Sequence, residues 1–288
     1  MIGPLDRLLG KPKTSHGAAA VVTGAGSGIG AAFAVELARR GGAVVCSDID
    51  EARAQATAAS IADQGAKATA VRCDVSQIDD VSALAEQAQS WLGGPPTLVI
   101  NNAGVGAGGA AIGDVPLDDW AWTLGINLWG PIHGCHVFAP ILRDAGPTSS
   151  GHGPRGIINV ASAAAFGAAP GMAAYNVSKA GVLSLSETLA AELSGTGIRV
   201  TVLCPTFVKT NILESGRITQ ESTELATKLM RWTGLSAEKV ARTCLDAHDR
   251  GELYCMPQLD AKFGWGVKRI APHTYTRVTG LVSRANMH

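Results

Sequence analysis

Short apolar runs separated by longer stretches of helical character make up most of the chain. Several runs carry apolar residues at consecutive positions, as in 44–45, 98–100 and 157–158, rather than at every second position. Strands that are apolar on both faces are typical of parallel sheets covered by helices on both sides. The pattern predicts seven strands, at 18–23, 43–48, 68–73, 97–100, 156–161, 198–204 and 253–256.

Helical stretches lie between these runs. The first is rich in alanine and stops at Gly41-Gly42, and glycine commonly ends a helix. The repeated strand–helix–strand order predicts an α/β fold, namely a Rossmann-like, doubly wound parallel sheet of about seven strands with helices on both faces. The expected helices span 29–40, 51–64, 77–92, 117–145, 173–193 and 237–250.

The domain organisation follows from the same pattern, because no repeat, low-complexity tract or linker interrupts it. We expect one catalytic domain at 18–257, which includes a substrate loop at 206–235. Residues 1–17 form an N-terminal extension that lacks the apolar core of a secretory signal. Residues 258–288 form a C-terminal extension.

Composition excludes two classes of function. The 288 residues carry no net formal charge, whereas nucleic-acid binding needs a basic excess. No run of 18 apolar residues exists, so no membrane span is predicted. The six cysteines form no Cys-x-x-Cys pair and are expected to be buried, reduced thiols, which fits a cytoplasmic location. His133, Cys135 and His136 match no common zinc spacing, so no metal site is predicted.

A glycine-rich turn follows the first strand and opens the first helix, in the order Thr23-Gly24-Ala25-Gly26-Ser27-Gly28-Ile29-Gly30. Without side chains there, the backbone can approach a pyrophosphate closely, and the free N–H groups of the helix N-terminus can bind it. The position between a strand and a helix is what makes this run informative. The candidate pyrophosphate-binding residues are Gly24, Ser27, Gly28, Ile29 and Gly30.

The end of the second strand indicates which nicotinamide cofactor is bound. Asp48 can accept hydrogen bonds from the adenosine ribose and would repel a 2′-phosphate, which favours NAD over NADP. Ile49, rather than a basic residue, follows it. Arg39 and Arg40 are the alternative, as ligands of a 2′-phosphate, but we favour their interpretation as solvated residues at a helix end.

The third and fourth strands also end in candidate cofactor residues. Asp74 and Val75 are placed to meet the adenine. The short side chains that follow the fourth strand let the chain pass close to the cofactor. They are Asn102, Ala103 and Gly104.

The candidate catalytic residues lie on the second half of the expected sheet. Tyr175 and Lys179 are four residues apart in an expected helix, which stacks them on one face. A neighbouring ammonium lowers the pKa of a phenol, so Tyr175 can exchange a proton with an alcohol. Ser162 follows the fifth strand and can hold the substrate oxygen. Asn127 lies inside a helix, where an amide is a mild misfit unless it holds a water that feeds protons to Lys179.

With these residues in place, the chain resembles the short-chain dehydrogenase/reductase family over residues 18–257. Thr23-Gly24-x-x-x-Gly28-x-Gly30 is similar to the family's cofactor motif, and Asn101-Asn102-Ala103-Gly104 to its central-strand motif. Asn127, Ser162, Tyr175 and Lys179 fall where the family places its four catalytic residues.

The resemblance implies a role for each of these residues, and no metal. Tyr175 is the acid/base, and Lys179 binds the nicotinamide ribose while lowering the tyrosine pKa. Ser162 orients the substrate oxygen, and Asn127 holds the proton-relay water. The long helices at 117–145 and 173–193 resemble those that form dimers and tetramers in the family, so a homodimer or homotetramer is expected.

The chain departs from the family pattern after the sixth strand. Pro205-Thr206 stands where the family usually has Pro-Gly, so we expect a different local geometry but the same chemistry. Thr210 falls where the family contacts the nicotinamide carboxamide. Pro205, Thr206 and Val208 complete the candidate cofactor residues of this turn.

Three segments are expected to line the substrate pocket: 104–113, 163–171 and 207–235. The first two are small and apolar without Lys or Arg, which favours a largely apolar secondary alcohol or ketone of the steroid, lipid or aryl type. Arg217 and Arg231 in the third either face solvent or meet a polar tail. The alternatives are an NADP-dependent carbonyl reductase, a non-catalytic NAD-binding sensor or scaffold, and an NAD-using epimerase or dehydratase.

The C-terminal extension is basic, with five Lys or Arg, one acidic residue and interleaved aromatic residues. One interpretation is peripheral contact with a membrane surface. The other is a tail that packs over the substrate entrance or a neighbouring subunit. We favour the second because Gly264, Gly266 and Pro272 disfavour a continuous amphipathic helix.

Overall fold

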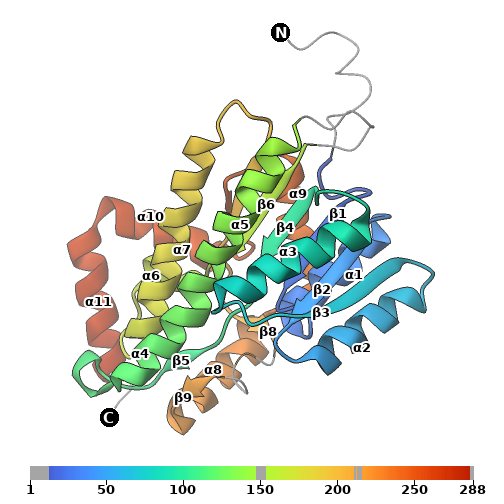
Figure 1. The fold of residues 1–288 in the computed structure, drawn as a ribbon. Coiled ribbons are helices and arrows are strands. Elements are labelled where there is room, and N and C mark those ends of the chain that lie inside the picture. The colour runs from blue at the N-terminus through green and yellow to red at the C-terminus, as the bar shows by residue number, and fades with distance from the viewer. Residues whose placement is uncertain (1–12, 147–153, 211, 213–215, 286–288) are drawn as a thin grey trace.

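A seven-stranded parallel sheet forms the centre of the molecule (Figure 1). The computed structural model describes residues 13–146, 154–210, 212 and 216–285. The strand order is β11-β7-β6-β4-β1-β2-β3, which reverses direction between β1 and β4 as in doubly wound folds. The strands are β1 (Ala19–Thr23), β2 (Ala43–Asp48), β3 (Lys67–Arg72), β4 (Leu98–Asn101), β6 (Gly156–Val160), β7 (Arg199–Leu203) and β11 (Tyr254–Cys255). All seven predicted strands are confirmed, each end within one residue.

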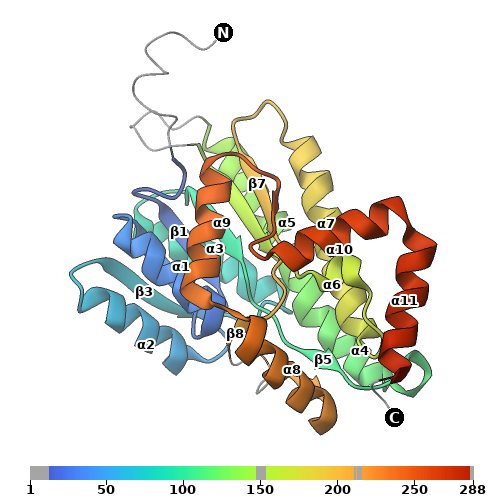
Figure 2. The ribbon, with the colours of Figure 1, turned by 180° about the vertical axis from the view of Figure 1, so that it is seen from behind.

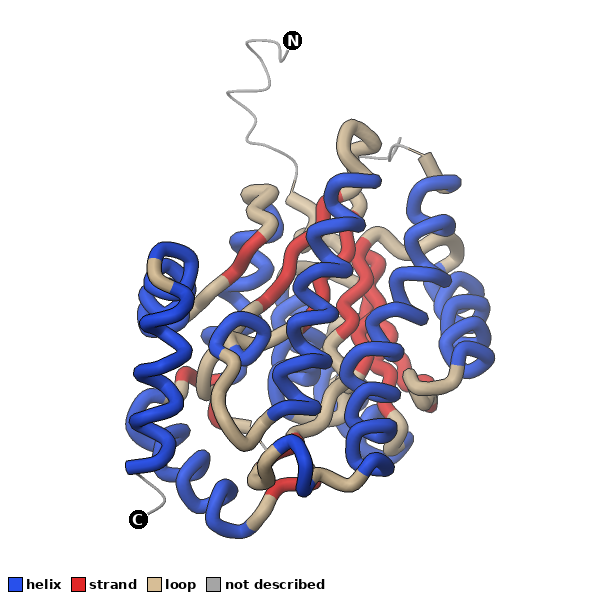
Figure 3. The backbone as a smooth tube through the Cα atoms, turned by 90° about the vertical axis from the view of Figure 1, so that its left-hand side faces the viewer, coloured by secondary structure: helices blue, strands red, loops and turns tan. Residues whose placement is uncertain are grey.

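Helices cover both faces of this sheet, as predicted (Figures 2 and 3). One apolar cluster joins the sheet to three helices through residues such as Phe33, Ile61 and Leu245. A second cluster on the other face includes Leu84 and Phe138. The helices of the first face are α1 (Gly28–Arg39), α2 (Glu51–Ala62) and α9 (Ala237–Asp249), and those of the second are α3 (Ile78–Leu92), α5 (Gly130–Asp144) and α7 (Ala173–Glu192).

The helix expected at 117–145 is not one regular helix. It consists of α4 (Leu117–Leu124), a π-helical segment (Gly125–Trp129) and α5. Proline has no backbone N–H, so Pro131 cannot make the α-helical bond to the carbonyl four residues earlier, that of Asn127. The irregularity therefore falls at a candidate catalytic residue.

Short elements surround the carboxyl ends of the strands. The predicted substrate loop at 206–235 is largely structured, and it is tied to itself and to the loop after β4 by two small parallel ladders. The first joins β8 (Val208–Lys209) to β10 (Leu235–Ser236), and the second joins β5 (Ala107–Gly108) to β9 (Arg217–Ile218). The other elements here are η2 (Ile112–Asp114), α6 (Ala164–Gly167) and α8 (Gln220–Thr233).

The C-terminal extension forms two helices, α10 (Leu259–Ile270) and α11 (Pro272–Ala285), as Figure 2 shows. The expectation that Gly264 and Gly266 would interrupt a helix is wrong, because both lie inside α10. An interior glycine costs about 1 kcal/mol relative to alanine, and tertiary packing commonly outweighs such a cost. Here Trp265 of α10 packs against Phe166 and Tyr254.

The end of the N-terminal extension is fixed to α1 and α9. The main-chain N–H and the hydroxyl of Ser15 donate to the Asp249 carboxylate at 2.9 and 2.6 Å, and Arg40 donates to the Ser15 hydroxyl at 2.7 Å. Arg39 and Arg40 also bind Glu36, and the hydrogen bond from Arg39 contributes most to lowering the pKa of that carboxyl to about 2. Residues 1–12 lie outside the described residues.

The cysteines and the lengths of the helices bear on two further expectations from the sequence. All six cysteines are free and buried, as expected. Within the described ranges, no helix has the length and apolarity needed to cross a membrane.

Candidate active site

The glycine-rich turn between β1 and α1 lies at the carboxyl edge of the sheet. Gly24 and Gly28 have φ angles of 65° and 54°, in the left-handed region that favours glycine. A Cβ on Gly30 would collide with the Gly24 carbonyl oxygen, so the turn and helix touch through backbone. Ser27 caps α1 without a side-chain hydrogen bond, and no acidic residue lies in the first turn. The turn and the helix N-terminus thus form a cradle suited to a pyrophosphate.

Asp48 lies beside this turn at the end of β2. Its carboxylate accepts hydrogen bonds from the N–H groups of Gly26 and Asp50 at 2.9 and 3.0 Å. Ile49 is 58% exposed next to it. Both residues are therefore at the edge where the ribose and the adenine were expected.

Sequence reasoning missed the basic residue closest to this site. Arg39 and Arg40 end α1 and lie at the opposite edge of the sheet from the glycine-rich turn, in the network with Glu36. Arg53, in the first turn of α2, is the cation next to the turn: a Cβ on Gly26 would lie 2.7 Å from the Arg53 Cβ. The side chain of Arg53 is 57% exposed and pairs with Asp50 at 3.2 Å. The helical position of Arg53, directly after the β2 turn, was the available signal.

The loops after β3 and β4 close the other side of the cradle. Asp74 accepts hydrogen bonds from the N–H and hydroxyl of Ser76 at 3.0 and 2.7 Å. The Val75 carbonyl lies 2.9 Å from Nδ1 of His133. The amide of Asn102 donates to the carbonyls of Thr23 and Gly24 at 2.9 and 3.2 Å, which clamps β4 to the glycine-rich turn. A Cβ on Gly104, which follows Ala103, would lie 3.3 Å from Lys179 Nζ, so the residues after β4 reach this candidate catalytic lysine.

The structure brings Ser162, Tyr175 and Lys179 together. Tyr175 and Lys179 lie one turn apart on α7, and Nζ of Lys179 is 5.8 Å from the centre of the Tyr175 ring. Lys179 is only 3% exposed and donates to the Val160 carbonyl at 3.0 Å. Ser162 is hydrogen-bonded to Tyr175 and also contacts the Pro205 carbonyl at 3.4 Å.

Burial sets the pKa values of this pair. It raises the pKa of the Tyr175 phenol above its usual value, opposed in part by the Ser162 hydrogen bond. It lowers the pKa of Lys179 to about 8, because a buried ammonium loses its hydration. The Lys179 ammonium donates to the Val160 carbonyl rather than to the phenol oxygen. The expectation that Lys179 and an oxidised nicotinamide ring together lower the pKa of Tyr175 stays a prediction.

Asn127 is fully buried within the π-helical segment. Its side-chain oxygen accepts from the N–H of Val105, and its amide donates to the carbonyl of the same residue, both at 2.8 Å. The amide side chain therefore fastens the loop after β4. Because Pro131 offers no N–H, the main-chain carbonyl of Asn127 lacks the α-helical donor four residues later.

The turn after β7 approaches the cradle from the far side. Thr210 packs over Gly28, because a Cβ there would lie 3.1 Å from the Thr210 Cγ2. Val208 is buried in β8. Thr206 bonds through its N–H to Gln258 at 3.2 Å and through its hydroxyl to Asp260 at 3.3 Å. The Thr206 that replaces the usual glycine thus ties this turn to the start of α10.

Comparisons with known proteins agree with this geometry. The family model described as short chain dehydrogenase matches residues 18–221. The chain belongs to the short-chain dehydrogenase family. A short-chain dehydrogenase/reductase of Burkholderia phymatum, solved in complex with NAD, is 33% identical and superposes with a TM-score of 0.82 over 89% of this chain and 94% of that one.

The curated relatives of this chain differ in length and in name. The probable oxidoreductase EphD of Mycobacterium tuberculosis is 40% identical over 71% of this chain, which spans only 33% of that protein. The 1-deoxy-11-beta-hydroxypentalenate dehydrogenase of Streptomyces avermitilis is 34% identical over 84% of this chain and 85% of its own length.

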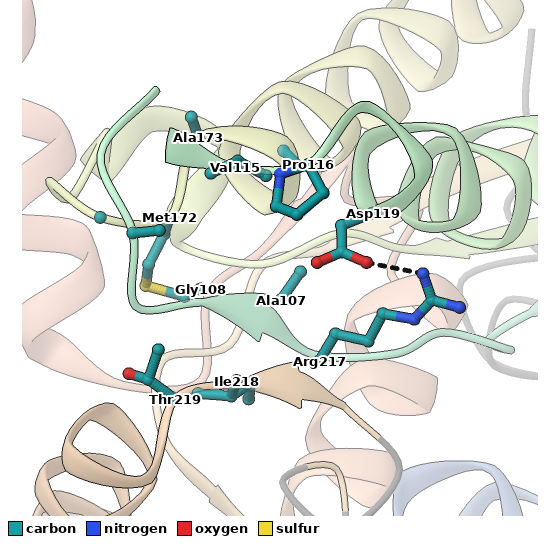
Figure 4. A pocket seen from close by; sticks show the side chains of 13 residues that line it. Ala107, Gly108, Val115, Pro116, Asp119, Met172, Ala173, Arg217, Ile218 and Thr219 are labelled. Atoms are coloured by element: carbon teal, nitrogen blue, oxygen red, sulfur yellow. Dashed lines mark hydrogen bonds and ion pairs between the residues drawn. The ribbon is translucent and has the colours of Figure 1, made fainter. Parts of the chain in front are cut away.

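A cavity of about 350 Å³ lies next to the candidate catalytic residue Tyr175 (Figure 4). The cavity lies under the β5–β9 ladder and against the start of α7, two of whose residues, Ala173 and Ala174, immediately precede Tyr175. Its walls are mainly apolar. They include Ala107, Ala110, Val115, Pro116, Met172 and Ile218.

An ion pair forms the polar end of this cavity. Nη1 of Arg217 lies 2.6 Å from Oδ1 of Asp119 (Figure 4). The Arg217 guanidinium also stacks on the Trp122 ring at 4.4 Å. Arg217 belongs to the substrate loop, whereas Asp119 and Trp122 belong to α4. The pair therefore fastens residues 217–218 to α4. All three segments expected to line the substrate pocket contribute to this cavity, but 163–171 does so only through Gly171. Ala163 and Ala165 of that segment pack instead against an apolar cluster with Trp265.

Proposed function

We propose that this enzyme interconverts a secondary alcohol and a ketone with NAD, on a largely apolar substrate of the steroid, lipid or aryl type. The observation that carries the proposal is the Ser162–Tyr175–Lys179 group, in which Ser162 and Lys179 are buried and Tyr175 is partly buried, beside a glycine cradle that side chains would fill. A binding protein without turnover has no need of a buried ammonium next to a partly buried phenol, since burying a charge is costly.

The residues fit the cofactor at each part of its length. Gly24, Ser27, Gly28, Ile29 and Gly30 would hold the pyrophosphate, and Asp48 and Ile49 the adenosine ribose. Asp74 and Val75 would meet the adenine, and Asn102, Ala103 and Gly104 would line the middle. Pro205, Thr206, Val208 and Thr210 would surround the nicotinamide, and Lys179 would bind its ribose. NAD, when bound, supplies the hydride acceptor.

The chain's own residues orient the substrate and transfer its proton. The Ser162 hydroxyl orients the substrate oxygen towards Tyr175, and the Tyr175 oxygen takes the hydroxyl proton during oxidation or returns it during reduction. Lys179 favours the phenolate electrostatically. A water on the main-chain carbonyl of Asn127 would connect Lys179 to bulk solvent.

The pH dependence should reveal this proton transfer. We expect the oxidation rate at saturating NAD⁺ to rise with pH, because only the ionised Tyr175 can accept a proton. The apparent pKa should lie below about 10, the value of a free phenol, since the positive charge of the oxidised ring and that of Lys179 together offset the burial that raises the pKa in the protein alone. Stopped-flow rates measured across pH test this, and a profile without an ionisation in that range would contradict it.

We expect NAD⁺ to be preferred over NADP⁺ by at least about tenfold in kcat/KM, or about 1.4 kcal/mol. Asp48→Ala should narrow this preference, because it removes both the ribose contact and the repulsion of a 2′-phosphate, while Arg53 stays beside the turn as a cation that can attract the phosphate. The matched control is Arg39→Ala, at the opposite edge of the sheet, which should leave the ratio unchanged. Equal use of the two cofactors by the wild type would contradict the assignment of Asp48.

The position of the substrate loop should depend on Arg217, which fastens the loop to α4. We expect Arg217→Ala to lower kcat/KM for bulky apolar alcohols by about fivefold, because a partly exposed ion pair and a cation–π contact contribute roughly 1 kcal/mol. Arg231→Ala, on α8 of the same loop, is the matched control and should have little effect. If both variants behave alike, Arg217 does not fasten the loop.

We also propose self-association through the α4–α5 and α7 helices, as a homodimer or homotetramer. Trp129 and Val177 on these helices are about half exposed, and the π-helical segment packs against α7. Apolar residues exposed on adjacent helices are typical of subunit interfaces.

A further inference from the structure

The outer face of α10 presents a row of large apolar side chains to solvent. Leu259, Phe263 and Ile270 are 80%, 75% and 87% exposed. Their spacing of four and seven residues places them on one side of the helix. On α11, Val278, Leu281 and Val282 are also more than half exposed. Among the described residues, this is the longest stretch of chain in which exposed apolar side chains recur so closely.

The opposite face of α10 fixes the direction in which this row points. Ala261 is buried, and the Trp265 ring lies 5.1 Å from Tyr254 and 6.3 Å from Phe166. Lys268 donates to the Phe166 carbonyl at 2.6 Å. Since this face already packs against the domain, the apolar row cannot turn inward without breaking these contacts.

The charges around the row select among its possible occupants. Lys262 and Arg269 lie beside it on the same helix, and Arg269 stacks on Trp265 at 4.9 Å. Residues 259–282 contain four Lys or Arg and one acidic residue, a net charge of +3 in a chain whose overall charge is zero. Two copies meeting through this face would bring like charges together, whereas an anionic surface would be attracted.

We propose that α10, continued by α11, docks the enzyme on an anionic lipid surface. An apolar stripe flanked by basic residues is the arrangement of helices that lie in the membrane interface. The interpretation favoured from the sequence rested on Gly264, Gly266 and Pro272 as helix breakers. The helix is interrupted before Pro272, but α10 is continuous across both glycines. The proposal does not rest on the enzyme's substrate.

Docking at this place would also be connected to the catalytic site. Trp265 and Lys268 hold α6, which begins two residues after Ser162. The element that faces lipid is thus packed on the loop that carries a candidate catalytic hydroxyl, close to a region where apolar alcohols would partition.

Vesicle flotation tests the proposal with the full-length chain. We expect the protein to float with vesicles of phosphatidylcholine and phosphatidylglycerol but not with phosphatidylcholine alone, and the bound fraction to fall as salt is raised, because exposed charges are screened. Failure to bind the anionic vesicles would overturn the proposal.

Two variants locate the binding face. The double variant Phe263→Asp/Ile270→Asp should abolish flotation. The double variant Lys262→Gln/Arg269→Gln should lower the bound fraction at least severalfold. Both should keep the wild-type mass in light scattering.

The control is Trp91→Asp, an apolar-to-acidic change on α3, which should float like the wild type. Circular dichroism verifies that each variant folds. Flotation unaffected by the α10 substitutions would overturn the proposal, as would a halved mass, which would show that the face joins subunits.

Discussion

Tyr175→Phe is expected to lower turnover by about 10²- to 10⁴-fold, the range for a positioned acid or base, while NAD binding is retained. The substitution keeps the ring on α7 and removes only the oxygen that exchanges the proton. Isothermal titration with NAD⁺ and initial rates on the best alcohol measure the two quantities separately.

The control for this substitution is another phenol of the same chain. Tyr254 donates to Glu187 at 2.6 Å and lies on β11, outside the group formed by Ser162 and Lys179. Tyr254→Phe should leave turnover near the wild-type value. A Tyr175→Phe enzyme with near-normal turnover would remove Tyr175 from the proton transfer.

Lys179→Met is expected to have the larger effect, because it changes both binding and turnover. Methionine keeps the apolar stem but removes the ammonium, so a ribose contact and the charge that favours the phenolate are lost together. Loss of a charge-assisted hydrogen bond of about 1.5–3 kcal/mol should weaken NAD binding by about tenfold or more, and turnover should fall below that of Tyr175→Phe.

Removal of this buried charge should not destabilise the fold, since burial already lowers the pKa of Lys179 to about 8. Thermal denaturation of the variant therefore separates a catalytic effect from unfolding. Lys67→Met, at the exposed amino end of β3, is the matched control. Unchanged NAD affinity in Lys179→Met would contradict the ribose contact.

The sheet was predictable from the sequence because its strands are apolar on both faces. Strands that are apolar on both faces are stable only when helices cover both sides of the sheet. The alternation of such strands with helices therefore predicted the doubly wound parallel sheet. The glycine-rich turn was predictable for a related reason, since Gly24 and Gly28 adopt left-handed conformations and Gly30 leaves no room for a side chain.

The sequence was less informative about helix geometry that depends on tertiary contacts. The π-helical segment at Asn127 depends on the two hydrogen bonds to Val105 and on Pro131, and the pattern of apolar residues in 117–145 does not reveal it. The helix α10 forms across two glycines because its inner face packs on α6. Helix propensity therefore predicted the interruption at Pro272 correctly, but not the continuity of α10 across Gly264 and Gly266.

In the candidate site, too, some features were predictable from the sequence and others were not. The spacing of Tyr175 and Lys179 on one helix predicted that they are neighbours. Their pKa values were not predictable, because they depend on burial that only the folded chain reveals. The cation next to Asp48 was also missed: Arg53 is distant from the glycine-rich turn in sequence but beside it in the fold.

The most direct test of the proposed function is NADH formation, followed by absorbance, in a screen of secondary alcohols with the wild-type enzyme and NAD⁺. The screen should span steroids, fatty alcohols and aryl alcohols, with short hydroxy acids and sugars as the contrasting set. We expect NADH formation with bulky apolar alcohols and little NADH formation with short hydroxy acids and sugars. NAD⁺ binding without NADH formation from any alcohol would contradict it and would favour a sensor or scaffold.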